Sequence, residues 1–313
     1  MLFYLLRRLL YSIPILIGVS LLTFVLFYMT SSPEQMARKN LSAKNPSPKQ
    51  ITTWIVKHGY DKPRSEQFKK HMTELFLFRF GKSDVNGEDI RERLIKGAGP
   101  SGMLGLAAFA LSMVTTVTFA LIAAYYRGTY VDGFLTFLSV FLMSVVYMVY
   151  IIAGQFILGK ILKYAPLAGY TSGTSAWKFL LLPVIVAVIS GLGGSMRLYR
   201  TFLLEEMGQD YVRTARAKGV GERAVLFSHV LKNAAIPIIT SVVLGIPLIF
   251  LGSLLLESFF GIPGLGGLTV DAITNQDFAI VRAMVFIGTI LYIIGAMLTD
   301  ICYALVDPRV RFE

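Results

Sequence analysis

The chain has 313 residues, of which 55% are hydrophobic and only 16% are charged, and its mean hydropathy is +0.63. Because a soluble domain is about 25% charged, this composition indicates a membrane protein. The single cysteine, Cys302, excludes an intrachain disulfide framework and a cysteine-rich metal site. The net charge of +11 does not indicate nucleic-acid binding, since basic residues in membrane proteins set topology or lie near anionic lipid headgroups.

Six segments are apolar enough to cross a bilayer, which takes about 20 residues of helix. A charge at the centre of such a helix costs roughly 2.5–3.5 kcal/mol. Five segments contain no Asp, Glu, Lys or Arg: Leu9–Met29, Ser101–Tyr126, Gly133–Gly159, Phe179–Met196 and Ala234–Leu256. The sixth, Ala283–Thr299, ends at Asp300. The sequence therefore predicts an all-α integral membrane protein with six transmembrane helices and both termini on one side.

The first segment follows Arg7 and Arg8, as the core of a signal peptide would. Its 21 apolar residues exceed the roughly 7–15 of a signal-peptide core. We interpret it as a retained membrane anchor.

The distribution of Lys and Arg favours cytoplasmic termini. The segments that would then lie inside hold 12 of these residues, including Arg309 and Arg311, against 4 in the short outer loops. The 71-residue segment Thr30–Pro100 would lie outside with 14 basic and 8 acidic residues. This weighs against the orientation, although loops beyond about 60 residues largely escape the rule.

This long polar segment is expected to fold. "NPSPKQ" should break any early helix, whereas Ile51–His58 and Glu66–Phe80 are helix-compatible, and "GEDIRERLI" is typical of an amphipathic helix start. We expect a small folded insertion or an entry platform.

Catalytic motifs are not evident. "GKS" at 81–83 lacks the upstream glycine of a phosphate-binding loop, since Phe76 stands there. The three histidines are scattered and do not belong to a metal-binding or catalytic motif, so a metal or hydrolase site is not expected. Two polar residues within the spans, Gln155 and Asp300, are candidates for function. For both, a satisfied hydrogen bond between helices is the favoured interpretation over substrate contact.

A charged insert, Arg197–Asn233, separates the fourth and fifth segments. Asp210 and Arg213 can pair on a helix surface, and Gly219 can end that helix in a left-handed turn. Glu222 suits the start of a second helix. The pairs Leu226/Val230 and Phe227/Leu231 form an apolar stripe. These features predict a helical hairpin that leads back into the membrane.

A simple connector between spans needs only a few residues, so two interpretations of the hairpin stay open. It is either a solvated or lipid-bound connector, or a docking element for a partner. The small residues Thr214, Ala215 and Ala217 before the glycine turn favour insertion into a partner's cleft.

"QDYVRTARAKG" followed by "HVLKNAAIP" resembles the cytoplasmic loop of ABC importer permeases, in the branch for dipeptides, oligopeptides and nickel. The resemblance covers nearly the whole chain, in order and at the expected spacing. The other matching stretches are "LLRRLLYSIPILIGVSLLTF", "HGYDKPRSEQF" with "FGKS", "LPVIVAV" with "RLYRTFLLEE", "GIPGLGGL" and "TDICYALVDPRVRF".

This resemblance implies a type I ABC importer permease in the bacterial inner membrane, with both termini cytoplasmic. It implies an N-terminal helix over 1–29, a periplasmic insertion over 30–100, and a transmembrane core over 101–313 with a cytoplasmic coupling loop at 197–233. The implied partners are a homologous second permease, two ATPase subunits that bind ATP and Mg, and a periplasmic binding protein. The chain itself would hold no catalytic residue, metal or cofactor.

The resemblance also implies roles for particular residues. Contacts with the ATPase would come from the coupling loop, with Gly219 allowing the turn and Ala215 fitting the cleft. The implied coupling residues are Asp210, Tyr211, Arg213, Thr214, Ala215, Arg216, Ala217, Lys218 and Gly219. A periplasmic loop or gate would contain Glu257, Pro263, Gly264 and Gly266.

The sequence departs from the family pattern at several places. Ser144-Val145-Val146 replaces the usual Ser-x-Pro, so a proline kink is missing. Pro100-Ser101-Gly102 stands where Pro-Ala-Thr is expected, and Gly267 where a basic residue is common. Arg213-Thr214-Ala215 occupies the place of Glu-Ala-Ala in other importers, as is usual for the peptide branch.

Three alternatives remain open. A nickel or other small-solute permease of the same family is not separated from a peptide permease by any residue. A stand-alone secondary transporter lacks support because paired intramembrane charges and an inverted repeat are not evident. A membrane enzyme lacks a catalytic cluster.

Overall fold

The computed structural model describes residues 2–30, 32–41, 46–173 and 175–306, so Arg309 and Arg311 lie outside the described residues. In the described part, the regular structure is helical except for one isolated bridge between Lys82 and Asp89. The chain divides into two compact units. One comprises Met1–Ala98 with Leu268–Ile294, and the other Gly99–Gly267 with Gly295–Glu313.

The first unit contains the predicted insertion as a set of short helices. Its elements are α1 (Leu2–Thr30), α2 (Pro33–Asn40), α3 (Pro48–His58), α4 (Arg64–Phe76), the start of α5 (Ile90–Tyr125), most of α13 (Leu265–Thr274) and the first half of α14 (Phe278–Val306). The expected helices before and after position 60 are therefore confirmed, as is the helix start in "GEDIRERLI".

Serine caps set where α2 and α3 begin. Ser32 and Ser47 each accept the N–H of a glutamine three residues on, Gln35 and Gln50, whose side chain returns to the cap. Proline occupies the first turn of both helices, where its missing N–H costs nothing. "NPSPKQ" lies between α2 and α3, which agrees with the prediction that it breaks an early helix, and its last three residues begin α3.

Two carboxylates connect the insertion to the start of α14 within this unit. Asp277 accepts hydrogen bonds from the Ser83 hydroxyl, from the Asp84 N–H (3.3 Å) and from the Ile280 N–H (3.3 Å). Asp84 in turn accepts the N–H of Ala279 at 3.2 Å. The exposed N–H groups of a helix N-terminus need such acceptors, so the loop after α4 is fixed to α14.

The second unit forms a helical bundle. It contains the rest of α5, α6 (Tyr130–Ser144), α7 (Tyr147–Gly154), the π-helical η1 (Gln155–Ile161), α8 (Ala176–Met207), α9 (Asp210–Ala217), α10 (Glu222–Ala224), the π-helical η2 (Val225–Val230), α11 (Leu231–Leu251), α12 (Leu254–Phe260), the first residues of α13 and the end of α14. Among the described residues, five helices are long and apolar enough to span a membrane, or up to seven spans if each of two bent helix pairs counts as one.

The predicted third span is not a continuous helix. α6 and the α7–η1 segment are bent by 97°, because Val145 and Val146 have extended backbones. The hydroxyl of Tyr150 donates to the Leu142 carbonyl at 2.6 Å, which satisfies an acceptor freed by the break. The bend thus forms without the proline that the family pattern led us to look for.

His71 is a buried histidine in α4, a helix outside the candidate spans. Its side chain packs near Phe24, and its buried Nε2 has no hydrogen-bond partner in the part of the chain that the structure describes. Burial, with a smaller contribution from the charge of Arg282, lowers the pKa of His71 to about 4. The ring is therefore neutral at neutral pH.

We expect the His71 ring to make the folded protein sensitive to acid. Because the pKa is lowered on folding, its contribution to stability is complete above pH 6.5 and declines as the pH falls toward 4. At pH 5 the loss amounts to about 2 kcal/mol. Chemical denaturation of the detergent-solubilised chain at pH 7 and pH 5 should show this loss in the wild type and much less of it in His71→Phe. The exposed His58→Phe is the control, and equal acid sensitivity of wild type and His71→Phe would contradict the assignment.

Candidate functional site

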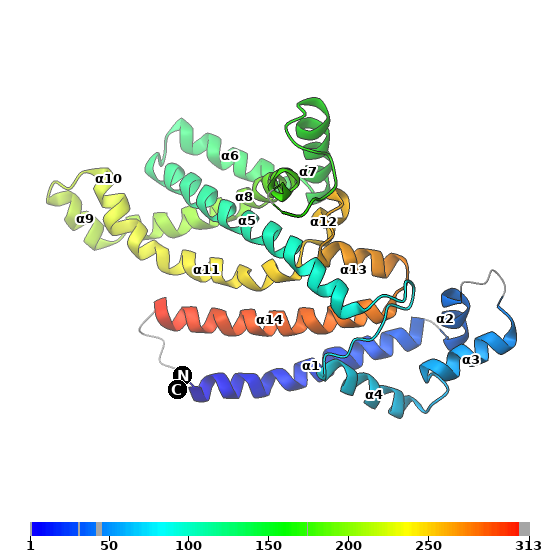
Figure 1. Cartoon of the computed structure of the whole chain (residues 1–313). Coiled ribbons are helices and arrows are strands. Elements are labelled where there is room, and N and C mark those ends of the chain that lie inside the picture. Colours follow the sequence, from blue (N-terminus) through cyan, green and yellow to red (C-terminus); the bar gives the residue numbers. More distant parts are fainter. Residues whose placement is uncertain (1, 31, 42–45, 174, 307–313) are drawn as a thin grey trace. The chain divides into compact units, whose positions relative to one another are not determined.

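The charged insert forms a helical hairpin between α8 and α11. α8 ends at Met207, and α9 begins after the extended residue Gln209. The chain turns at residues 218–221 and returns through α10 and η2 into α11. α9 and α10 lie beside each other at one end of α8 and α11 (Figure 1). The predicted helix, glycine turn and second helix starting at Glu222 are confirmed.

Gly219 allows the tight turn of the hairpin. It has φ +78°, and its N–H donates to the Arg216 carbonyl at 2.9 Å. The N–H of Val220 then donates to the Ala215 carbonyl at 3.2 Å, the closure typical of a left-handed helix end. A Cβ on Gly219 would meet no atom within 4 Å, so backbone conformation rather than space requires glycine here.

The inner face of α9 packs against the chain's own core. Val212 is fully buried and Ala215 is 7% exposed. Both belong to a cluster that includes Leu203 of α8 and Val225 and Leu226 of the returning segment. This corrects the expectation that Ala215 fits a partner's cleft, because its methyl group already lies inside this chain.

The outer face of α9 is polar and exposed. It consists of Asp210, Arg213, Thr214, Ala217 and Lys218, and we call these five residues the outer face. The predicted pair of Asp210 and Arg213 is present, with Oδ1 and Nη1 3.5 Å apart. Both side chains are largely exposed, so the pair contributes little stability. These groups are therefore available for contacts outside the chain.

Two polar contacts at the surface connect α9 to its neighbours. Arg216 pairs with Glu222 across the turn through two hydrogen bonds, Nε to Oε1 at 2.8 Å and Nη2 to Oε2 at 3.2 Å. The Tyr211 hydroxyl donates to Glu206 at the end of α8. Partial burial, together with this carboxylate, raises the pKa of Tyr211. Arg216 and Tyr211, which the resemblance implied as ATPase contacts, therefore hold α9 in place within this chain.

An ion pair fixes the helix from which the hairpin extends. Arg200 of α8 donates Nε and Nη2 to the two oxygens of Asp132 in α6, at 2.8 and 2.7 Å. Asp132 also accepts the Gly128 N–H at 3.1 Å. Two turns earlier on α8, a Cβ on Gly193 would lie 2.6 Å from the Ser139 carbonyl oxygen, so α6 and α8 pack with their backbones close together. The sequence did not lead us to predict this pair. The available signal was that Asp132 directly precedes the third apolar segment and Arg200 closely follows the fourth.

A second cluster surrounds the buried carboxylate of Glu257 in α12. Its Oε1 accepts the Ser101 hydroxyl at 2.8 Å and the Ser253 N–H at 3.0 Å, and its Oε2 accepts the Gly267 N–H at 3.0 Å. The Ser101 oxygen accepts the Leu265 N–H at 2.7 Å. Glu257 is fully buried, so these bonds compensate its desolvation.

The predicted gate residues meet at this cluster, apart from Pro263. Gly264 and Gly266 are buried beside Glu257, whereas Pro263 is exposed. A Cβ on Gly264 would overlap Glu257 Oε2 and Ser101 Oγ, and one on Gly266 would lie 2.7 Å from the Ser253 carbonyl carbon. Ser101 was noticed in the sequence only as a departure from Pro-Ala-Thr, and its hydroxyl at the start of an apolar run was the available signal.

We expect Gly264→Ala to destabilise the chain by about 1–3 kcal/mol, the range for overpacking, because the added methyl displaces a buried carboxylate. Thermal unfolding in detergent measures the loss. Gly191→Ala in α8 is the matched control, since a Cβ there meets nothing within 4 Å and alanine favours a helix. A Gly264→Ala protein as stable as the control would refute the packing described here.

The two polar residues of the spans lie apart from the hairpin. Gln155 donates Nε2 to the carbonyls of Leu167 (3.2 Å) and Phe259 (2.9 Å), which agrees with the favoured structural interpretation. Asp300 is half-buried in α14. Over the described residues, no three His, Cys, Asp or Glu side chains are grouped to hold a metal ion.

Two family models match most of the chain. Residues 116–312 match the family described as binding-protein-dependent transport system inner membrane component, and residues 1–87 match the N-terminal family of the same membrane components. The first match contains the hairpin, the Arg200–Asp132 pair and Glu257, whereas Ser101 lies before its first residue.

Curated relatives are similar over nearly their entire length. The oligopeptide transport system permease protein AppB of Bacillus subtilis is 31% identical, with 99% of each chain covered. A probable peptide ABC transporter permease of Sinorhizobium fredii, y4tP, is 30% identical, again with 99% of each chain covered. The metal-staphylopine import system permease CntB of Staphylococcus aureus is 32% identical over 98% of each chain.

Proposed function

Because the chain belongs to the family of binding-protein-dependent transport system inner membrane components, we propose that it is the membrane-spanning permease subunit of an ATP-driven peptide importer. The observation that carries the proposal is the braced hairpin, which presents a polar outer face while its inner face is part of the bundle core. A homologous permease, two ATPase subunits and a solute-binding protein complete the transporter.

The proposed topology has six crossings and a cytoplasmic hairpin. It counts α6 with α7–η1 as one span and α12–α13 as a re-entrant loop, both of which are bent pairs. The Arg200–Asp132 contact supports it by joining the hairpin end of α8 to the α5–α6 turn, as expected if both face the cytoplasm. The insertion, the Glu257 cluster and the start of α14 then lie at the opposite, outer ends of the spans.

In this mechanism the ATPase subunits grip the outer face and move α9. Shifting a two-state gate from 1:99 to 99:1 takes about 5.5 kcal/mol of differential binding. A loosely held loop would lose that energy in its own motion. The packed inner face and the Arg216–Glu222 and Tyr211–Glu206 contacts instead couple α9 to α8 and the returning segment.

We expect charge reversal on the outer face to uncouple transport without unfolding the chain. Arg213→Glu combined with Lys218→Glu should lower ATPase co-purification and ATP-driven uptake at least tenfold, since both side chains are exposed. Gly219→Val should reduce both as well, because valine disfavours φ +78°. Membrane abundance checks that the variants fold.

Lys178→Glu is the matched control for these reversals. This exposed lysine lies in the first turn of α8, at the end of the helix far from the hairpin. Co-purification and uptake unchanged from wild type in the outer-face double variant would refute the docking role.

Peptide is the proposed substrate because relatives named for oligopeptide or peptide transport are similar over the full length. The metal-staphylopine permease, at 32% identity, makes a metal chelate the second candidate. Proteoliposomes with the complete transporter, its binding protein and ATP should accumulate labelled di- or oligopeptide. Competition by unlabelled peptide but not by a metal chelate is expected. Uptake of the chelate alone would favour the second candidate.

A further inference from the structure

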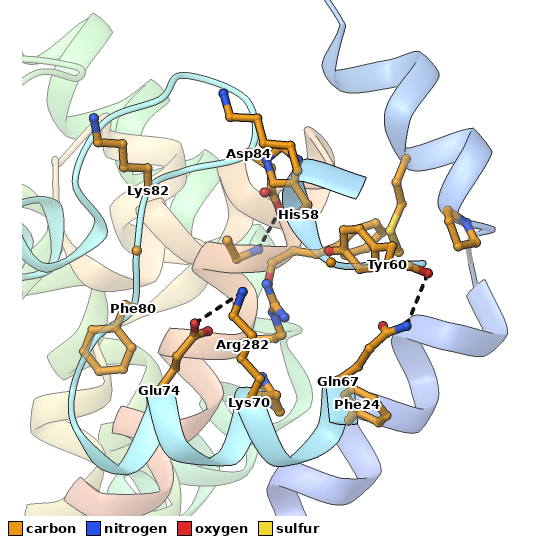
Figure 2. A pocket seen from close by; sticks show the side chains of 18 residues that line it. Phe24, His58, Tyr60, Gln67, Lys70, Glu74, Phe80, Lys82, Asp84 and Arg282 are labelled. Carbon is orange, nitrogen blue, oxygen red and sulfur yellow. Dashed lines mark hydrogen bonds and ion pairs between the residues drawn. The ribbon is translucent and has the colours of Figure 1, made fainter. Parts of the chain in front are cut away.

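A cavity of about 230 Å³ lies inside the first unit. Residues of α1, α2, α3 and α4, the loop after α4 and the start of α14 line it (Figure 2). Arg282 of α14 lies amid the labelled side chains, with Lys70 and Glu74 on one side and Tyr60 and Gln67 on the other (Figure 2). Neither the hairpin nor the Glu257 cluster contributes to this cavity.

The cavity lies where two candidate spans leave the membrane. Phe24, near the end of α1, and Arg282, in the second turn of α14, both line it. α1 and α14 have apolar windows long enough to cross the hydrocarbon. Since the last residues of one and the first of the other meet at the cavity, its depth corresponds to the lipid headgroups.

The lining is more cationic than anionic. Lys57, Lys70, Lys82 and Arg282 face it together with two carboxylates, Glu74 and Asp84. Both carboxylates have partners in the chain: Glu74 lies 3.8 Å from Lys70 Nζ, and Asp84 accepts the Ala279 N–H and interacts with the charge of Arg282. The excess of positive charge therefore suits an anion.

His71 adds a second observation that points to a ligand. It is 6% exposed, it lines the cavity, and its Nε2 has no hydrogen-bond partner among the described residues. A buried polar atom without a hydrogen bond costs about 1–3 kcal/mol. A neutral imidazole can carry its proton on Nε2 and donate it to a bound oxygen.

An apolar groove runs along the same two helices. It has a volume of about 350 Å³ and is lined by Gly18, Val19, Leu22, Thr23 and Leu26 of α1 and by Val281 and Val285 of α14. Val281 adjoins Arg282 in the sequence, and Val285 follows within one turn. A polar, cationic cavity and an apolar groove thus occur together where α1 and α14 meet.

We propose that this pair of cavities binds an anionic phospholipid. The phosphate lies in the cationic cavity, where Arg282 contacts it through its guanidinium and His71 Nε2 donates a hydrogen bond. Lys70 and Lys82, both exposed, flank the headgroup. One acyl chain occupies the groove between α1 and α14. A free phosphate would use the same polar groups but would leave the groove unused.

The test measures lipid retained by the full-length chain in nanodiscs of phosphatidylglycerol and phosphatidylcholine in equal amounts. Native mass spectrometry after mild delipidation should show preferential retention of phosphatidylglycerol. We expect Arg282→Gln to reduce that preference about tenfold and His71→Leu to reduce it severalfold. Arg282→Lys should retain part of it, because lysine keeps the charge but not the bidentate fork.

Two further variants distinguish binding of a lipid from binding of a free anion. Val285→Phe fills the groove and should lower lipid retention while leaving every cationic group in place. Lys178→Gln, which removes a charge outside the cavity, should change nothing. Absence of a phosphatidylglycerol preference, or a preference untouched by Arg282→Gln, would overturn the proposal. Displacement by excess inorganic phosphate, with no effect of Val285→Phe, would assign the cavity to a free anion instead.

Discussion

The packing of α9 against its own bundle is the interaction on which the proposed coupling depends. Val212 is fully buried and Ala215 nearly so, among side chains of α8, η2 and α11. Burying one valine stabilises this contact by roughly 1.5–3 kcal/mol, more than the exposed Asp210–Arg213 pair contributes. Because the inner face is occupied in this way, a force applied to the outer face has to move the bundle with it.

In the proposed mechanism α8 receives this force, and α8 is held against α6 at two points. Arg200 joins α8 to Asp132, and Gly193 lets the backbones of α6 and α8 approach closely. A bidentate arginine–carboxylate pair at low exposure fixes orientation as well as distance. α6 and α8 thus form a paired element that ends on one side at the hairpin and on the other at the 97° bend. Rotation of α9 would be transmitted to that bend.

Local patterns predicted much of this structure because the responsible forces are local. The apolar runs, Gly219 and the Asp210–Arg213 pair could be identified from spacing alone. Contacts between segments far apart in the sequence could not be identified from spacing. Ala215 was expected to face a partner, since small residues suit a close contact on either side of a helix. The bend at Val145 was not predicted because no proline marks it in the sequence. The Tyr150 hydroxyl instead satisfies the Leu142 carbonyl that the break leaves without its helical partner.

Both units solve the same physical problem at the breaks between α11 and α14. Where a helix ends, N–H groups lose their carbonyl partners, and low-dielectric surroundings make each loss costly. In one unit Asp277 accepts such N–H groups and is held by the Ser83 hydroxyl. In the other, Glu257 does so and is held by Ser101. Each carboxylate needs its serine because burial would otherwise leave a charge without enough donors. Ser83 lies shortly before α5 and Ser101 lies within it, so in each unit a serine from this stretch of the chain fixes the break of that unit.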